Sequence, residues 1–139
     1  MTIEQIDHTA LAVRDLNEAL ARYEKLFGLS AHHRQVIPDQ RVEVAFLPVG
    51  TSQLELVQPL DSESGVARFL QRRGEGLHHI GVSVDDIRAE LQRLAANGVK
   101  LIDSEPRRGV HGLVAFVHPR DTGGLLIELV QNGAILDRH

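Results

Sequence analysis

The chain of 139 residues has the length of one ordinary domain, and its apolar residues, 42% of the total, suffice for a hydrophobic core. Its formal net charge is −4, whereas nucleic-acid-binding proteins usually carry a positively charged surface, so no nucleic-acid partner is expected. The absence of cysteine excludes disulfides, thiolate metal sites and cysteine nucleophiles.

The N-terminal stretch MTIEQIDHTALAV lacks the basic start and the long apolar run of a signal peptide. No segment approaches the roughly 20 consecutive apolar residues that cross a bilayer. We therefore expect a cytoplasmic protein with no membrane partner.

The first half of the chain predicts a strand, a helix and then further strands. The strand lies in IDHTALAV, and the helix covers residues 16–28, with Asp15 as N-cap and Glu18 three residues later in a capping-box pattern. Leucine and aromatic side chains at helical spacing form one apolar face of this helix, which includes Phe27. Strands are predicted in VAFLPVG and QLELV, and a short extra helix is predicted over residues 65–73.

The second half repeats this pattern, which indicates an internal duplication. LHHIGVSVDDI matches IDHTALAVRDL, so that His79 corresponds to His8. A helix over residues 87–98 follows, with Asp86 as its N-cap. VAFVHPR and LIELV then echo the earlier strands. The sequence thus predicts βαβββ twice, as module one (about residues 3–60) and module two (about 76–133), joined by a connecting helix near 61–75.

The phase of the strands separates two histidines and two glutamates from the core. His8 shares its strand face with Ala10 and Ala12, while larger branched side chains occupy the other face, where a helix would cover them. His79 repeats this arrangement beside glycine and serine. A histidine among such small residues leaves space for a ligand.

Glu55 and Glu128 likewise point away from the leucine and isoleucine side chains that flank them in their strands. Two modules related by a pseudo-two-fold axis would bring both glutamates together with His8 and His79. Two imidazole nitrogens and two carboxylate oxygens suit a borderline-to-hard divalent cation. We therefore predict one metal site formed by these four residues, with cobalt or manganese preferred and zinc or magnesium as alternatives.

Structural roles have to be weighed against this prediction. A lone histidine on a strand is more often a half-buried core residue than a ligand, and a lone glutamate often faces solvent. Repetition of both residues at matching phase favours the metal site. His78 has the opposite phase and is expected to face a helix, whereas His111 and His118 are candidates for a pocket edge but not for ligands. The histidines expected at the surface are His32, His33 and His139.

The chain resembles the vicinal oxygen chelate superfamily (the glyoxalase, bleomycin resistance and dioxygenase proteins) and, within it, the methylmalonyl-CoA epimerase family. The stretches GEGLHHI, EPRRGVHG and HPRDTGGLLIEL carry the more specific part of this resemblance, which covers nearly the whole chain. It implies one glyoxalase-like domain over residues 1–139, of the α+β class, in which two tandem βαβββ modules form one cupped mixed β-sheet with helices on its outer face. A homodimer is also implied.

The resemblance implies an isomerase that epimerises methylmalonyl-CoA at C2 through a metal-stabilised enolate, with an acyl-CoA as substrate. It places the metal ligands at His8, Glu55, His79 and Glu128, where some family members have glutamine at the second position. It also places the acid/base residues at Glu43 and Glu128, because inversion needs one group on each face of C2. Which cations contact the CoA moiety stays open, with Arg72, Arg73, Arg107 and Arg108 as candidates.

Two other functions share much of this pattern. A glyoxalase I-type lactoylglutathione lyase would use the same four ligands, so only the substrate pocket separates it from an epimerase. A non-catalytic small-molecule binding protein of the same fold usually lacks the complete set of ligands. The motifs around His79 and after Glu105 favour the epimerase.

Overall fold

In the computed structural model, residues 3–133 are described, and the chain divides into two compact units. We call residues 8–78 the N-terminal unit, and residues 1–7 together with 79–139 the C-terminal unit. Residues 3–7 group with the C-terminal unit, and two of them contact its strand residues directly. The Ser83 hydroxyl lies 3.5 Å from the Gln5 carbonyl oxygen, and the Asn132 amide donates to the Asp7 carboxylate at 2.6 Å.

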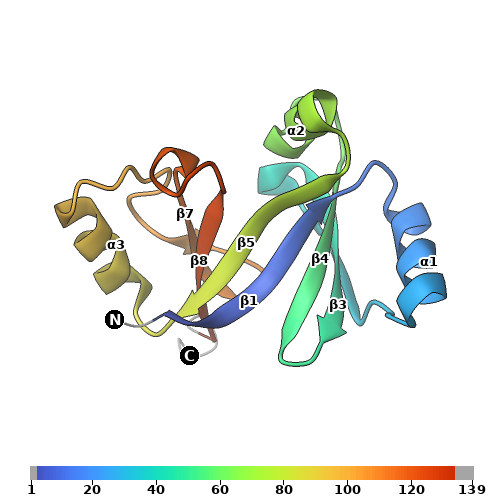
Figure 1. Cartoon of the computed structure of the whole chain (residues 1–139), viewed down its shortest axis with the longest axis horizontal. Coiled ribbons are helices and arrows are strands. Elements are labelled where there is room, and N and C mark those ends of the chain that lie inside the picture. The colour runs from blue at the N-terminus through green and yellow to red at the C-terminus, as the bar shows by residue number, and fades with distance from the viewer. Residues whose placement is uncertain (1–2, 134–139) are drawn as a thin grey trace. The chain divides into compact units, whose positions relative to one another are not determined.

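The N-terminal unit has the predicted βαβββ order, followed by a second helix (Figure 1). Strand β4 runs parallel to β1, while β2, β3 and β4 pair antiparallel in sequence. The strand order is β2-β3-β4-β1. The elements are β1 (Ile3–Ala12), α1 (Leu16–Phe27), β2 (His33–Ile37), β3 (Val42–Val49), β4 (Ser52–Pro59) and α2 (Gly65–Arg73).

The C-terminal unit repeats this topology. Strand β8 runs parallel to β5, and β6, β7 and β8 pair antiparallel, in the order β1-β5-β8-β7-β6. The elements are β5 (Gly76–Val84), α3 (Ile87–Ala96), β6 (Arg107–Arg108), β7 (Gly112–Val117) and β8 (Ile127–Asn132). The predicted α+β class and the duplicated βαβββ order are therefore confirmed.

Both module helices begin at the predicted caps. The side chain of Asp15 accepts from the Glu18 amide at 3.0 Å, and Asp86 accepts from the Ala89 amide at 3.1 Å, which satisfies backbone donors that have no partner inside the helix. The connecting helix α2 covers residues 65–73, as predicted. Among the described residues, no helix is long and apolar enough to cross a membrane.

Each helix covers the sheet face that carries the large apolar side chains. In the N-terminal unit Leu16 of α1 packs with Leu47 and Leu56, and all three are fully buried. In the C-terminal unit Ile87 of α3 occupies the matching place in its own cluster. Phe27 departs from the expected apolar face and is 67% exposed, because it is the last residue of α1, where the chain turns away at the left-handed Gly28.

Candidate functional site

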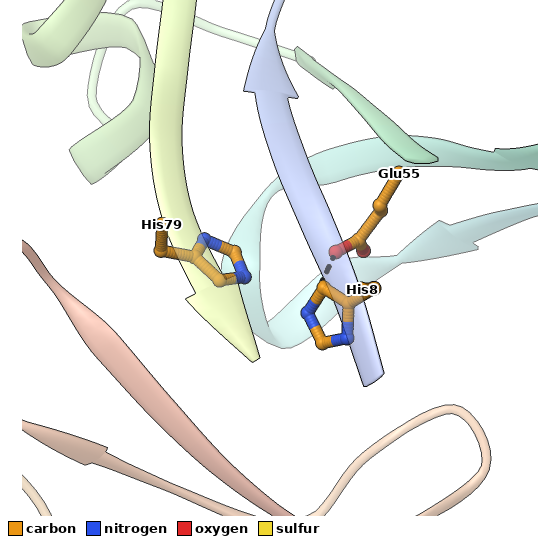
Figure 2. Close-up of side chains that lie close together, drawn as sticks. All are labelled: His8, Glu55 and His79. Atoms are coloured by element: carbon orange, nitrogen blue, oxygen red, sulfur yellow. Dashed lines mark ion pairs between the residues drawn. The ribbon is translucent and has the colours of Figure 1, made fainter. Parts of the chain in front are cut away.

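A buried histidine and a buried glutamate meet in the N-terminal unit. Glu55 of β4 is aligned with Ala10 of β1, so His8 lies two residues further back on the same strand face. The His8 Nε2 atom is 3.4 Å from Glu55 Oε1, and the two residues are only 5% and 8% exposed (Figure 2). The sequence prediction that these two residues share a face is confirmed.

The C-terminal unit contains the same arrangement. Glu128 of β8 is aligned with Gly81 of β5, and His79 again lies two residues back along the strand. The His79 Nε2 atom is 3.3 Å from Glu128 Oε1, and the residues are 6% and 7% exposed. The duplication seen in the sequence therefore extends to the geometry of the two pairs, to within 0.1 Å in the nitrogen–oxygen distance.

The donor atoms of each pair fit a divalent cation. A buried carboxylate destabilises the fold unless it is paired or coordinated, and here each one faces an imidazole nitrogen. Two ligand atoms, each about 2.0–2.2 Å from one tetrahedral ion, stand about 3.3–3.6 Å apart. The observed separations of 3.4 and 3.3 Å match this spacing. Each unit thus holds a pair of side chains whose type, burial and spacing suit metal ligation.

The small residues that share the strand face of His8 are fully buried. Ala10 and Ala12 were expected to leave space beside the histidine, but both are 0% exposed. They are aligned with Glu55 and Val57 of the adjacent strand, and these larger neighbours share the same face. Small side chains at these positions therefore allow dense packing.

Glutamines that the sequence analysis did not single out tie each glutamate strand to its helix. Gln58 Oε1 accepts from the Leu16 amide at 2.7 Å, and Gln131 Oε1 accepts from the Ile87 amide at 2.8 Å. Leu16 and Ile87 are the first residues of α1 and α3, whose amides have no partner inside the helix. The signal was present in the sequence, since each glutamine follows its glutamate by three residues in ELVQ. Residues three positions apart on a strand point to opposite faces of the sheet. The glutamine therefore reaches the helix, while the glutamate faces the histidine.

Glu43 does not share the face of Glu55. In the antiparallel register of β3 and β4, Phe46 is opposite Glu55 and Glu43 is opposite Gln58, so the two glutamates leave the sheet on opposite sides. The Glu43 carboxylate instead binds Arg34 of β2, with Nε to Oε2 at 2.7 Å. This hydrogen bond raises the pKa of Arg34. Arg34 also donates to Asn17 of α1 at 2.7 Å, so the pair lies on the helix-covered face.

The histidines outside the two His–Glu pairs differ in their surroundings. His78 packs edge-on against Phe69 of α2 at 5.1 Å between ring centroids, as its phase predicted. His118 Nδ1 accepts from the Arg120 amide at 2.9 Å and so caps the turn after β7. His111 is exposed, and His139 lies outside the described residues.

The cations named as candidates for CoA contact differ in their surroundings. Arg107 pairs with Asp103 at 3.2 Å, and the guanidinium of Arg73 lies 5.7 Å from the centre of the Phe69 ring. Arg72 and Arg108 are exposed at the end of α2 and in β6. These contacts do not single out one of the four.

Known proteins resemble the chain in sequence and in fold. Residues 7–116 match the family model of the glyoxalase/bleomycin resistance protein/dioxygenase superfamily. An ethylmalonyl-CoA/methylmalonyl-CoA epimerase of Cereibacter sphaeroides is 39% identical over 132 residues, covering 93% of this chain and 98% of that protein. The crystal structure of a methylmalonyl-CoA epimerase from Mycobacterium tuberculosis, 35% identical, superposes with a TM-score of 0.93 over 99% of this chain and 94% of that one.

A variant of the Streptomyces coelicolor methylmalonyl-CoA epimerase, solved in complex with 2-nitronate-propionyl-CoA, is 34% identical. It superposes with a TM-score of 0.92 over 96% of this chain and 97% of that one. The sequence comparisons and the fold comparisons agree. The chain belongs to the glyoxalase/bleomycin resistance protein/dioxygenase superfamily and, within it, to the methylmalonyl-CoA epimerase family.

Proposed function

We propose that the chain epimerises methylmalonyl-CoA at C2, by removing the C2 proton and returning a proton to the opposite face. Relatives named for this reaction match nearly the whole chain, and one of them was solved with a CoA thioester. The observation that carries the proposal is the pair of buried His–Glu contacts, one in each βαβββ repeat.

We further propose that His8, Glu55, His79 and Glu128 bind one divalent cation, with cobalt or manganese preferred and zinc or magnesium as alternatives. The support is the donor set, the burial of all four residues and the ligand-like spacing within each pair. When bound, the cation would stabilise negative charge on the thioester oxygen as a Lewis acid. Because C2 lies between a thioester and a carboxylate, loss of its proton creates an enolate whose charge develops on that oxygen.

Glu128 is the residue we propose for proton transfer on one face of C2. Glu128 is buried, and its Oε1 atom lies 3.3 Å from His79 Nε2, so the imidazole orients the carboxylate while the second oxygen can accept a proton. The resemblance assigns the other face to Glu43. This role stays a prediction, and the strand register argues against direct contact of Glu43 with a substrate bound beside Glu55.

The reaction is tested by incubating one epimer of methylmalonyl-CoA in deuterated water with the purified protein and each of the four cations. Formation of the other epimer, labelled at C2, supports the proposal. Parallel assays with methylglyoxal and glutathione test the lyase. Lyase turnover without epimerisation would assign the lactoylglutathione lyase function instead. If the protein binds methylmalonyl-CoA but catalyses neither reaction, it is a binding protein.

The metal site is tested with two adjacent histidines. His79→Ala should abolish stoichiometric binding of a divalent cation and activity, while the fold persists because the core lies on the other face. His78→Ala is the matched control, since His78 packs against Phe69 on the opposite side of the strand. Unchanged metal content in His79→Ala would show that the assigned ligands are wrong.

A further inference from the structure

Phe116 of β7 is placed to orient His79. In the β7–β8 register Phe116 lies directly opposite Glu128, so both side chains leave the sheet on the same face. The Phe116 ring meets the His79 ring at a centroid distance of 5.3 Å and an interplanar angle of 85°, an edge-to-face contact. His79 is therefore held between the phenyl ring and the Glu128 carboxylate, which is 3.3 Å from its Nε2 atom.

The backbone of Phe116 is anchored by a carboxylate where a neighbouring strand would normally lie. Its amide donates to Asp103 Oδ2 at 2.9 Å, and its carbonyl accepts from the Ile102 amide at 3.0 Å. The short strand β6 pairs with β7 only at Val114 and Leu113 and does not reach Phe116. Arg107 fixes Asp103 through an ion pair of 3.2 Å.

In the N-terminal unit, the phenylalanine at the matching position is flanked by a regular strand, β2. Phe46, the repeat counterpart of Phe116, lies opposite Glu55. There β2 continues alongside, and His33 is aligned with Phe46. Both units therefore present a phenylalanine across from the glutamate. In the C-terminal unit a single β-bridge, Leu101 to Val117, and the Ile102 amide flank this position, and the side chain of Asp103 accepts from the Phe116 amide.

We propose that Phe116 and Asp103 are positioning residues for His79: Phe116 limits rotation of the imidazole, and Asp103 holds Phe116 in place. The terminal torsion of histidine is broad and roughly two-fold, so packing has to select the orientation that points Nε2 toward Glu128. The consequence for metal affinity rests on the proposed ligand role of His79. The effect on the order of the imidazole itself does not depend on a metal or on the reaction.

The experiment compares four variants. Phe116→Leu removes the ring contact, and Asp103→Ala removes the acceptor for the Phe116 amide. Asp103→Asn keeps an oxygen acceptor but loses the charge. Asp121→Ala is the matched control, because Asp121 also accepts a backbone amide, that of Lys100 at 2.8 Å, and also pairs with an arginine.

Three quantities are measured for each: the melting temperature, the affinity for Co²⁺ and Zn²⁺ by competition titration, and the His79 imidazole ¹⁵N signals of the metal-free protein. We expect Phe116→Leu and Asp103→Ala to weaken metal binding about three- to tenfold, the range of an aromatic pair contact, and to broaden or split the His79 signals. Asp103→Asn should stay near wild type.

The control separates positioning from general stability. Asp121→Ala should lower the melting temperature about as much as Asp103→Ala without moving the His79 signals or the metal affinity. If Asp103→Ala changes only the melting temperature, the positioning role is wrong. If the His79 signals respond but no variant or wild-type protein binds metal, the positioning role stands and the proposed metal site fails.

Discussion

Replacing Glu43 with glutamine distinguishes two roles that differ widely in magnitude. As an acid/base group, Glu43 would contribute about 10²–10⁴-fold in rate. As the partner of Arg34, it contributes an ion pair whose side chains are 39% and 23% exposed. Such partly exposed pairs contribute about 0.2–1 kcal/mol to stability, and 1 kcal/mol corresponds to only about fivefold in an equilibrium.

We expect the smaller effect, because the register places Glu43 on the face that α1 covers. Glu43→Gln should lower the melting temperature by a few degrees, reduce inversion less than about tenfold and leave metal binding intact. Arg34→Gln breaks the same ion pair but keeps the Glu43 carboxylate, so it should have similar effects. Arg41→Gln, which breaks an exposed ion pair with Asp61 of 3.6 Å, is the control for loss of a surface cation.

The assay measures inversion of methylmalonyl-CoA and deuterium wash-in at C2 separately. A loss of inversion beyond about 100-fold in Glu43→Gln, with metal content and melting temperature preserved and Arg34→Gln near wild type, would refute the register argument. Retained wash-in without inversion in that variant would then assign Glu43 to the second face of C2.

Three further changes test the parts of the fold that support the site. Gln58→Leu leaves the first amide of α1 without its acceptor, so it should destabilise the protein by about 1 kcal/mol, as loss of a helix cap does, which thermal unfolding would detect. Leu56→Ala removes a fully buried side chain beside Glu55 in sequence and should lower the free energy of unfolding in urea by about 2–5 kcal/mol. Glu55→Ala removes both the oxygen donor and its negative charge, so it should weaken Co²⁺ binding in a competition titration by at least the roughly tenfold that loss of an outer-shell partner costs. Unchanged affinity would remove Glu55 from the ligand set.

The sequence predicted which side of its strand each of the four candidate ligands occupies, because strand phase is a local rule. Alternation along a strand places His8 and Glu55 away from the core, and the repeat supplies an independent second instance at His79 and Glu128. The helix starts at Asp15 and Asp86 were also predictable, since a cap is a contact within four residues.

Contacts between distant segments were not predictable from these rules. The pairing of Glu43 with Arg34 follows from the register of β2 against β3, which depends on turn geometry between them. The contact of Asp103 with the Phe116 amide joins a loop to a strand 13 residues away. The location of the protein and its homodimeric state stay predictions.

The two βαβββ repeats carry equivalent His–Glu pairs, whereas epimerisation treats the two faces of C2 differently. Inversion requires different groups on the two faces of C2, and Glu43 has no carboxylate counterpart in the second repeat, where Leu113 stands at the matching position. In the structure both positions lie opposite a glutamine that caps the module helix, Gln58 or Gln131. The difference between Glu43 and Leu113 therefore falls on the helix-covered faces. On the faces that carry the His–Glu pairs, the units differ in how the phenylalanine opposite the glutamate is supported, by β2 in one and by Asp103 in the other.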